Sequence, residues 1–520
     1  MKKVLNRFAV FSLAATTGCM NLPSVGPDYT EPEVEAPVCA LPDAGSPTEE
    51  LSGTGEYKTA EAEADERVAV SEDLMARWWE RLNDPVLAEL VECAIADNLS
   101  FKAAVSRLRQ AEWEMIGTLS AFSPKASIDG SATRTESHRN NRSVQGAYRH
   151  RQLDVFNAGF NASWEIDIFG GNRRATEAAL AKAEAAGWGV AQAWVELTTR
   201  LGQQYITLRT IQDRIAVARN NLQLQSETYD ILKSRFDSGI GDELAVHQCA
   251  YIVEQTRARI PQLLSQEEAL KNAIAILAGK TPGELHETLK PVPGRDWLMS
   301  PQKVAELPMD LIRSRPDVKA AERTLAAQVA NVGVAKSAWY PKLFITGGLG
   351  LESVQASKFA QPGSFYASIG PSISWPLLQG GNVVARTKAA EARVEEARLN
   401  YELALESAYA EVRDNYSAYT LEYHRYQALN SAVKAATDAV TISQDLYKNG
   451  LRDFNNVLDA QRSRLNLEEE LAVSRGQITV DLIALYRSLG GGLASDVVFD
   501  CGCEGTETEE KKQEEEKQEE

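Results

Sequence analysis

The 520-residue sequence has few cysteines, few histidines and no excess of positive charge, and each shortage excludes a class of protein. Its six cysteines lie too far apart for a disulfide framework in a chain of this length. A net charge of −18 leaves no basic footprint for nucleic acid. The five histidines show no metal-ligand spacing, and no phosphate-binding glycine loop or nucleophile elbow accompanies them. We therefore expect no enzyme, no metal site and no cofactor.

Long hydrophobic runs are also missing. After residue 19 no stretch of 18 or more apolar residues occurs, so no transmembrane helix is expected. Any part of the chain that crosses a bilayer must then do so as β-strands in a closed barrel, because lipid cannot satisfy exposed backbone groups.

The beginning of the chain has the order of a lipoprotein signal. A basic start, an apolar stretch over residues 8–15 and small residues at 16–18 precede Cys19. This order predicts a signal peptide over 1–18 and acylation of the Cys19 thiol. An ordinary secretory signal with an incidental cysteine is the alternative interpretation.

Two terminal segments differ in composition from the rest. Residues 19–75 hold regularly spaced prolines among acidic and small residues, which predicts an extended, lipid-anchored arm. Residues 491–520 end in a glutamate-rich stretch without apolar residues, which predicts an acidic disordered tail. Cys501 and Cys503 are interpreted as a local disulfide or as unimportant, in preference to a metal or redox pair.

An internal duplication determines the predicted architecture. Residues 121–125, Ala-Phe-Ser-Pro-Lys, recur 217 positions later as Ala-Trp-Tyr-Pro-Lys, and Gly-Gly-Asn at 170–172 recurs at 380–382. We predict two repeats, residues 76–290 and 291–490. Each is expected to contain a helix, two strands, a long helix, a turn and a returning helix.

The strands are predicted from alternation. Residues 156–166 and 365–375 alternate apolar with small or polar side chains, and their partners begin after Pro124 and Pro341. Strands about 11 residues long with one apolar face are typical of membrane barrels. A hairpin from a soluble sandwich is the alternative.

The long helices are predicted from the heptad-like spacing of their apolar residues. Residues 382–449 contain neither glycine nor proline, and apolar residues recur in them about every 3.5 positions, which indicates a coiled-coil seam. Such a helix is about 100 Å long. The first half repeats the pattern from Val190 onward, and returning helices are expected over 243–277 and 454–489. Each repeat thus contributes one long antiparallel helical hairpin.

Four strands per chain are too few to close a barrel, for which about eight are needed. The strands must therefore come from several copies, and three copies would supply 12. The predicted fold class is an α+β membrane protein: a trimeric 12-stranded β-barrel continuous with a long periplasmic α-helical coiled-coil barrel.

Five sequence stretches carry a family resemblance. They are Val-Gly-Pro-Asp-Tyr at 25–29 with Pro32, Trp78-Trp79 with Asp84-Pro85, Arg315 to Arg323, Tyr340-Pro341, and Gly450 with Val457 to Arg462. In this order they resemble the outer-membrane efflux proteins of the OprM and NodT type, relatives of TolC. The resemblance covers about residues 19 to 490.

The resemblance implies a function, partners and site residues. It implies a homotrimeric exit duct in the outer membrane of a Gram-negative bacterium. The duct is joined through a periplasmic adaptor to an inner-membrane pump, usually proton-driven in this family, and exports small molecules such as drugs. It places Gly239 and Gly450 at the periplasmic tips, where the adaptor binds, and a gate at Asn456 and Asp459. The family has two carboxylates at the gate, so Asn456 makes one of the two rings neutral.

Two alternatives stay open from the sequence. A duct of the same fold could carry unfolded protein in type I secretion. A lipid-anchored periplasmic scaffold of coiled coils without a pore would need soluble hairpins in place of membrane strands, and the alternation over 366–375 argues against it.

Overall fold

The computed structural model describes residues 24–32, 77–137, 151–292, 312–449 and 451–491. Some predictions lie wholly or partly outside these ranges: the signal peptide, the acylated Cys19 with its arm, the turn residue Gly450, and the acidic tail with Cys501 and Cys503. The chain divides into two compact units. Unit 1 holds residues 107–186 and 320–402 with the N-terminal segment, and unit 2 holds the remaining helical segments.

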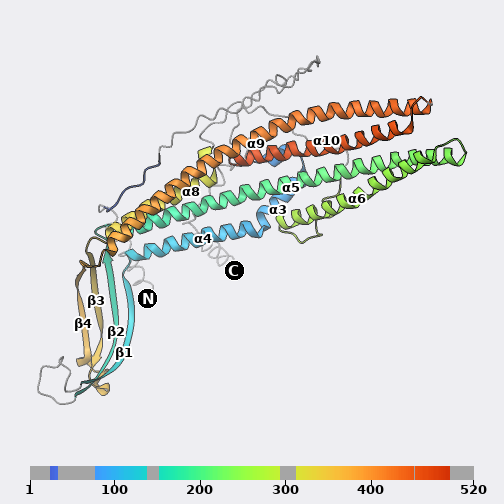
Figure 1. Ribbon diagram of the computed structural model, residues 1–520. Helices are drawn as coiled ribbons and strands as arrows, with labels where there is room; N and C mark the ends of the chain where they lie inside the picture. The colour runs from blue at the N-terminus through green and yellow to red at the C-terminus, as the bar shows by residue number, and fades with distance from the viewer. Residues whose placement is uncertain (1–23, 33–76, 138–150, 293–311, 450, 492–520) are drawn as a thin grey trace, which may run out of the picture. The chain divides into compact units, whose positions relative to one another are not determined.

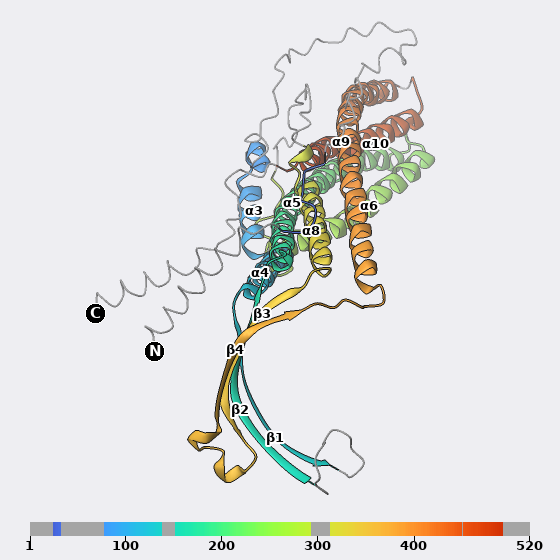
Figure 2. The same ribbon diagram turned by 90° about the vertical axis from the view of Figure 1, so that its left-hand side faces the viewer.

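Unit 1 contains one antiparallel sheet whose strands follow chain order: β1 (Lys125–Ser137), β2 (Arg151–Ile166), β3 (Lys342–Ser353) and β4 (Phe365–Ser374). Figure 2 shows the strands side by side in a curved sheet. Strands β2 and β3 come from different repeats and pair from Phe156 to Ile166, which joins the two repeats in one sheet. Strands β1 and β4 are the two edges of this sheet.

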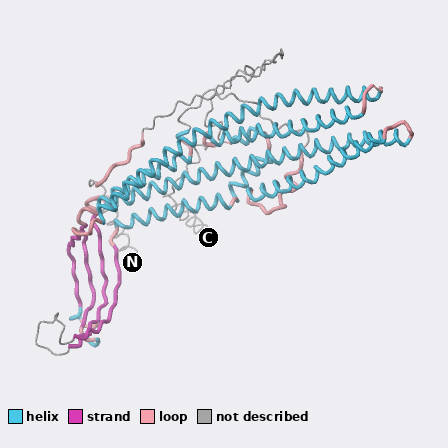
Figure 3. Tube along the Cα trace, in the orientation of Figure 1, coloured by secondary structure: helices cyan, strands magenta, loops and turns pink. Residues whose placement is uncertain are grey.

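Helices extend the strands at one end of the sheet (Figure 3). Helix α4 (Leu99–Leu119) leads into β1 and α8 (Pro316–Ser337) into β3, while α5 (Gly171–Asp237) follows β2 and α9 (Asn382–Lys448) follows β4. Helices α5 and α9 each contain 67 residues and are continuous from unit 1 into unit 2. The predicted long helices are therefore present.

Unit 2 contains α3 (Pro85–Asp97), the distal parts of α5 and α9, and the returning helices α6 (Glu243–Leu277) and α10 (Phe454–Ser488). Figure 1 shows α5 with α6, and α9 with α10, as two antiparallel hairpins. The predicted seam residues Leu405, Ala408 and Val412 are buried, as are Leu201 and Leu208 in the first repeat. The periodicity thus identified the buried side of each long helix.

No helix in the described ranges is both long and apolar enough to cross a membrane.

Candidate channel wall and helical tips

The sheet of unit 1 has two chemically different faces, because successive side chains of a strand point to opposite sides. One face carries apolar side chains from all four strands: Ile128, Phe156, Phe160, Trp164, Leu343, Ile345, Leu349, Ile369 and Ile373. Of these, Ile128 and Ile369 are each 85% exposed in the single chain. So large an uncovered apolar surface is typical of a face that meets lipid or another protein.

The opposite face of the sheet is mostly polar, and short side chains occupy its middle. Asn161 lies opposite Ser127 on one neighbouring strand and Gly348 on the other. The Asp129 carboxylate accepts hydrogen bonds from Ser127 Oγ at 2.7 Å and Asn161 Nδ2 at 2.8 Å. A shallow hollow of about 470 Å³ lies over these small residues. This face suits contact with water, as in the lumen of a channel.

Polar and aromatic groups mark the two ends of the apolar face. At the ends remote from the helices, Arg134 and Asp154 form a bidentate ion pair with distances of 2.7 and 2.8 Å. At the helix ends, Trp164 Nε1 donates to the Phe122 carbonyl at 2.8 Å, and Trp375 Nε1 donates to the Trp339 carbonyl at 3.2 Å. Tryptophans whose N–H groups are bonded and whose rings stay partly exposed are enriched where a membrane meets water.

An N-terminal segment, residues 24–32, crosses unit 1 and is called the strap below. Arg174, almost fully buried on α5, donates to the Asp28 carboxylate at 2.5 Å. Tyr29 packs against a cluster of alanines on α5 and α8 and donates its hydroxyl hydrogen to Glu322 at 3.2 Å. Burial and the neighbouring Glu322 raise the pKa of Tyr29, so the hydroxyl stays protonated and can donate. The Pro-Asp-Tyr stretch is therefore a docking segment.

The strap needs glycine where it crosses α8. A Cβ on Gly333 would lie 2.7 Å from the Arg174 side chain and 2.9 Å from the Val25 carbonyl oxygen. Gly26 has a φ of +112°, and a Cβ there would lie 2.6 Å from Gly333 Cα. Both positions require glycine, since a side chain would push the strap off the helix.

Gly239 ends α5 in the way predicted for a tip turn. Its φ is +74°, its N–H donates to the Phe236 carbonyl at 2.8 Å, and the N–H of Ile240 donates to the Arg235 carbonyl at 3.0 Å. This is a glycine C-cap of the Schellman type. Asp242 then caps α6 by accepting a hydrogen bond from the Leu244 N–H at 3.0 Å.

Gly450 lies outside the described residues, but the residue after it repeats the pattern of the first turn. The Leu451 N–H donates to the Leu446 carbonyl at 2.9 Å, matching the bond from Ile240 to Arg235. Ile240 and Leu451 are both largely exposed. Each helical hairpin thus presents one aliphatic side chain next to its turn.

The two hairpins share a hydrophobic core near these turns, called the tip cluster. It joins residues of three helices: Leu232 of α5, Ala245, Cys249 and Ile252 of α6, and Phe454, Val457 and Leu458 of α10. Burial raises the pKa of the Cys249 thiol to about 11, which keeps it neutral. The core holds α10 to the first hairpin and fixes which side of α10 is exposed.

Asn456 and Asp459, the predicted gate residues, lie on the exposed side of α10. The Asp459 carboxylate is 3.9 Å from the Arg462 guanidinium, which donates to the Tyr251 hydroxyl of α6 at 2.5 Å. Asn456 Nδ2 bonds the Asp453 carbonyl at 3.2 Å. In the sequence Arg462 stood out only as part of a family motif, and its role as the cation beside the Asp459 carboxylate was missed. The two positions therefore carry one amide and one ion pair in place of two free carboxylates.

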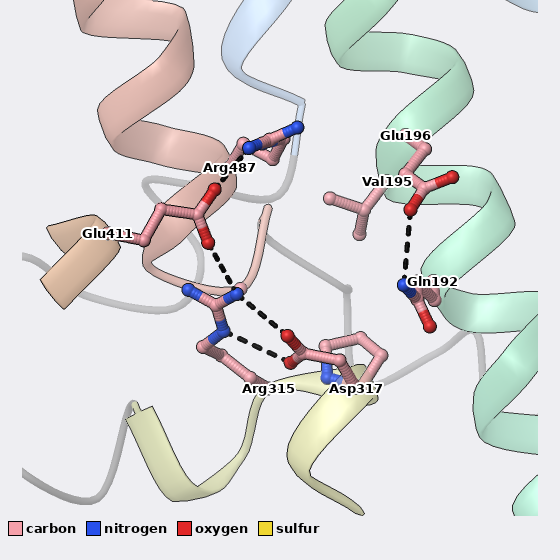
Figure 4. A pocket seen from close by; sticks show the side chains of 9 residues that line it. Gln192, Val195, Glu196, Arg315, Asp317, Glu411 and Arg487 are labelled. Carbon is pink, nitrogen blue, oxygen red and sulfur yellow. Dashed lines mark hydrogen bonds and ion pairs between the residues drawn. The ribbon is translucent and has the colours of Figure 1, made fainter. Parts of the chain in front are cut away.

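A second charged cluster, missed from the sequence, lies in unit 2 where α8 begins (Figure 4). Arg315 donates to Asp317 at 2.8 and 3.1 Å, to Glu411 of α9 at 2.7 Å, and to the Ser488 carbonyl of α10 at 2.6 Å. Arg487 bonds the second oxygen of Glu411. The residues border a cavity of about 130 Å³. The two arginines and the two carboxylates of the cluster pair with one another, so the cluster is suited to holding three segments together.

The Trp-Trp and Asp-Pro stretches have a similar structural role in unit 2. Asp84 caps α3 and accepts a hydrogen bond from the Tyr205 hydroxyl, which in turn accepts one from Arg209 at 2.8 Å. Trp78 lies so close to Gly202 on α5 that a Cβ there would be 2.1 Å from its ring. These stretches fasten α3 and the residues before it to α5.

Within the described ranges, no group of three or more His, Cys, Asp or Glu side chains is arranged to hold a metal ion.

Comparison with known structures identifies the class of protein. The chain is similar to the outer-membrane channel OprN, with 31% identity and a TM-score of 0.78, covering 90% of this chain and 99% of that one. Its four strands and long helices are thus the fold of an outer-membrane channel, as predicted from the duplication. The two-faced sheet is the part of this fold that suits a membrane.

Comparison of sequences then identifies the family. The model of the family described as outer membrane efflux protein matches residues 90–280 and 307–491, which is more than half of the chain. The chain belongs to the outer membrane efflux protein family. It is 28% identical to nodulation protein T of Rhizobium leguminosarum bv. viciae, over 94% of this chain and 95% of that protein. It is 25% identical to the cation efflux system protein CusC of Escherichia coli (strain K12), over 92% and 97%.

The resemblance drawn from the sequence is confirmed, and with it the assignment to efflux channels of the outer membrane. This family is one of channels, so the pore-free scaffold is set aside.

Proposed function

We propose that three copies of the chain form the outer-membrane exit duct of a tripartite efflux system. The observation that carries the proposal is the two-faced sheet, whose strands β1 and β4 have open edges in a single chain. An open edge cannot face lipid, and four strands cannot close on themselves, whereas three copies supply 12 strands. The apolar face would then meet lipid and the polar face would line the lumen.

The partners are proposed from the helical tips. The turns at Gly239 and Gly450 are the proposed contact with a periplasmic adaptor, and the exposed Ile240 and Leu451 beside them support this. The adaptor would join the duct to a proton-driven inner-membrane pump. Small molecules are the proposed cargo, which the name of CusC as a cation efflux protein supports.

The domain organisation is proposed as two efflux repeats, residues 76–290 and 291–490, after a signal peptide at 1–18 and an arm at 19–75, with an acidic tail at 491–520. Two separate matches to one family model support the repeats.

Mass and conductance of the purified protein test the proposal together. We expect a trimer in detergent and a small, mostly closed conductance in a planar bilayer. A monomer without conductance would overturn it. Drug susceptibility of a deletion strain separates the cargo classes, since a duct for unfolded protein would leave susceptibility unchanged and abolish secretion of a protein.

Cys19 is the proposed acylation site, and Cys19→Ser tests it. The variant should lose the acyl anchor and be released or mislocalised, because acyl chains provide much of the membrane affinity of an anchored segment. Fractionation with metabolic labelling by palmitate measures both effects, with Cys39→Ser as the control. Normal outer-membrane fractionation and undiminished labelling of Cys19→Ser would contradict the assignment.

Asp459 is the proposed charged gate residue, and Asp459→Ala should raise the conductance of the closed channel. Loss of the carboxylate leaves Arg462 without its acidic neighbour and removes one charge per copy from the tip. The matched control is Asp445→Ala, which removes a similarly exposed carboxylate lying 3.7 Å from Lys448. Equal conductance in wild type and Asp459→Ala would make Asp459 a surface ion-pair residue.

A further inference from the structure

The two repeats have the same structure where strands and helices meet. The bond from Trp164 to the Phe122 carbonyl recurs as the bond from Trp375 to the Trp339 carbonyl. Positions in α4 and α8 correspond with an offset of 217 residues, and positions at the starts of α5 and α9 with an offset of 210. For each contact between α5 and α8, these offsets therefore give the corresponding pair of residues on α9 and α4.

Within the chain, α5 of the first repeat packs against α8 of the second. Ala181 of α5 packs with Ala326 and Ala327 of α8, and the Arg174 side chain lies next to Gly333. The strap runs over this crossing and places the Tyr29 ring on the alanines. The side of α8 that meets α5 and the strap is consequently buried.

The counterpart of this crossing pairs α9 with α4, and its residues are exposed. Position 333 of α8 corresponds to Ile116 of α4, and Arg174 of α5 corresponds to Val384 of α9. Ile116 is 45% exposed and Val384 47% exposed. Ala330, which is fully buried, corresponds to Trp113, which is 70% exposed. Among the described residues of a single chain, the side of α4 that matches the buried side of α8 thus lacks a cover.

We propose that this side of α4 packs on α9 of a neighbouring copy, and that Trp113 and Ile116 fill there the place that the strap fills between α5 and α8. The proposal rests on the trimeric duct and adds the residue contacts between its copies. A second copy is the fitting partner because the α5–α8 contact already shows how one repeat packs on the next.

The residue exchanges at the counterpart positions compensate one another. Where the chain packs Arg174 and the strap against Gly333, the copies would pack Val384 against Ile116, so that two aliphatic side chains replace a glycine and a buried cation. An aliphatic pair needs no strap to neutralise it, whereas Arg174 uses Asp28 of the strap.

A second pair of exchanges gives charge complementarity. Ala181 corresponds to Glu391, and Ala326 corresponds to Arg109, so a contact between small apolar residues becomes one between opposite charges. In the single chain Arg109 is exposed and Glu391 is half-buried. Trp113 lies one turn from Arg109. Its ring would pack beside Glu391 and Arg109, as the Tyr29 ring of the strap packs on the alanines of α5 and α8. Independent exchanges at two levels of the same crossing therefore match.

Cysteine cross-linking tests the contact in the full-length protein in its own membrane. In an Ile116→Cys/Val384→Cys variant, oxidation should link copies and give covalent dimers and trimers on a non-reducing gel, since a Cβ placed at the matching Gly333 would lie 2.7 Å from the Arg174 side chain. The control pair is Ile116→Cys/Arg386→Cys, because residue 386 lies about 200° around the helix from 384. Each single cysteine variant supplies the background from native cysteines.

Strong cross-linking of the first pair alone would support the contact. A trimer by mass in which the first pair cross-links no more than the control would overturn this inference and leave the duct standing, whereas a monomer by mass would overturn both.

Charge reversal gives a second test that needs no cysteine. Arg109→Glu should lower the temperature at which the trimer dissociates in detergent, and Glu391→Arg in the same chain should restore part of the loss. Restoration is partial because Glu391 also bonds Lys388 at 2.8 Å and lies 3.9 Å from Lys336 of α8 in its own chain. Arg107→Glu, on another side of α4, is the control. An equal loss in Arg107→Glu and Arg109→Glu, without restoration, would contradict the contact.

Discussion

Ile369→Lys is expected to abolish assembled channels in the outer membrane, while Ser368→Lys on the same strand leaves them in place. Ile369 lies midway along β4 on the apolar face, and Ser368 lies on the polar face. A lysine at the middle of the lipid-facing side costs about 2–4 kcal/mol. Each copy of the trimer bears this cost, so the assembled channel is destabilised by three times the amount.

The comparison is sharp because the two residues are neighbours, both exposed in the single chain, and receive the same new side chain. Heat-modifiable trimer in outer-membrane fractions, measured on a gel with and without boiling, reads out assembly. Loss of trimer with Ser368→Lys and its retention with Ile369→Lys would reverse the assignment of lumen and lipid faces.

Arg315→Leu is expected to destabilise unit 2 by about 3 kcal/mol, near the lower end of the range for removing one partner of a buried ion pair. The lower end applies because Asp317 and Glu411 stay 34% and 26% exposed. The variant leaves both carboxylates and the Ser488 carbonyl without their shared donor. Thermal unfolding followed by circular dichroism measures the loss, and Arg462→Leu, which removes an exposed guanidinium, is the control.

The loss in Arg315→Leu should shrink as the pH falls. Burial raises the pKa of Asp317 and Glu411, but hydrogen bonds and charge from Arg315 outweigh it, so both pKa values lie below their ordinary ones. In wild type they stabilise the fold above the unfolded pKa, and this contribution is lost as pH falls through the folded pKa. Without Arg315, burial raises the pKa of Asp317, and protonation relieves the destabilisation.

Unfolding temperatures of both proteins at about pH 7.5 and pH 4.5 measure this dependence. A difference between wild type and variant that stays constant over this range would mean that Arg315 acts through packing alone.

The sequence predicted those parts of the fold that have a period. The returning helix at 243–277 has the predicted bounds, and α9 ends at Lys448, one residue before the predicted end. Alternation located β2 and β4, although β2 begins at Arg151, earlier than predicted, since its first apolar residues, Leu153 and Val155, lie on the opposite face from Phe156. Local periodicity suffices wherever one side of an element is buried along its whole length.

Contacts between distant segments could not be predicted in the same way. The Arg315 cluster joins residues separated by 96 and 173 positions in the chain, and no local pattern relates them. The spacing of Asp459 and Arg462 on α10 is local, whereas the bond from Arg462 to the Tyr251 hydroxyl of α6 spans 211 positions and has no sequence signal. The sequence predicted the strap only as part of the extended arm, because its docking depends on Gly333 more than 300 residues away.

Cys249 in the tip cluster gives the protein a built-in reporter of tip opening. The thiol is buried among residues of three helices, and its raised pKa leaves almost no thiolate to react with an alkylating reagent. Any motion that draws α10 away from α6 would expose it to water and return its pKa toward the ordinary value. The rate at which a maleimide labels this native cysteine therefore measures how often the tip opens, without a single engineered residue.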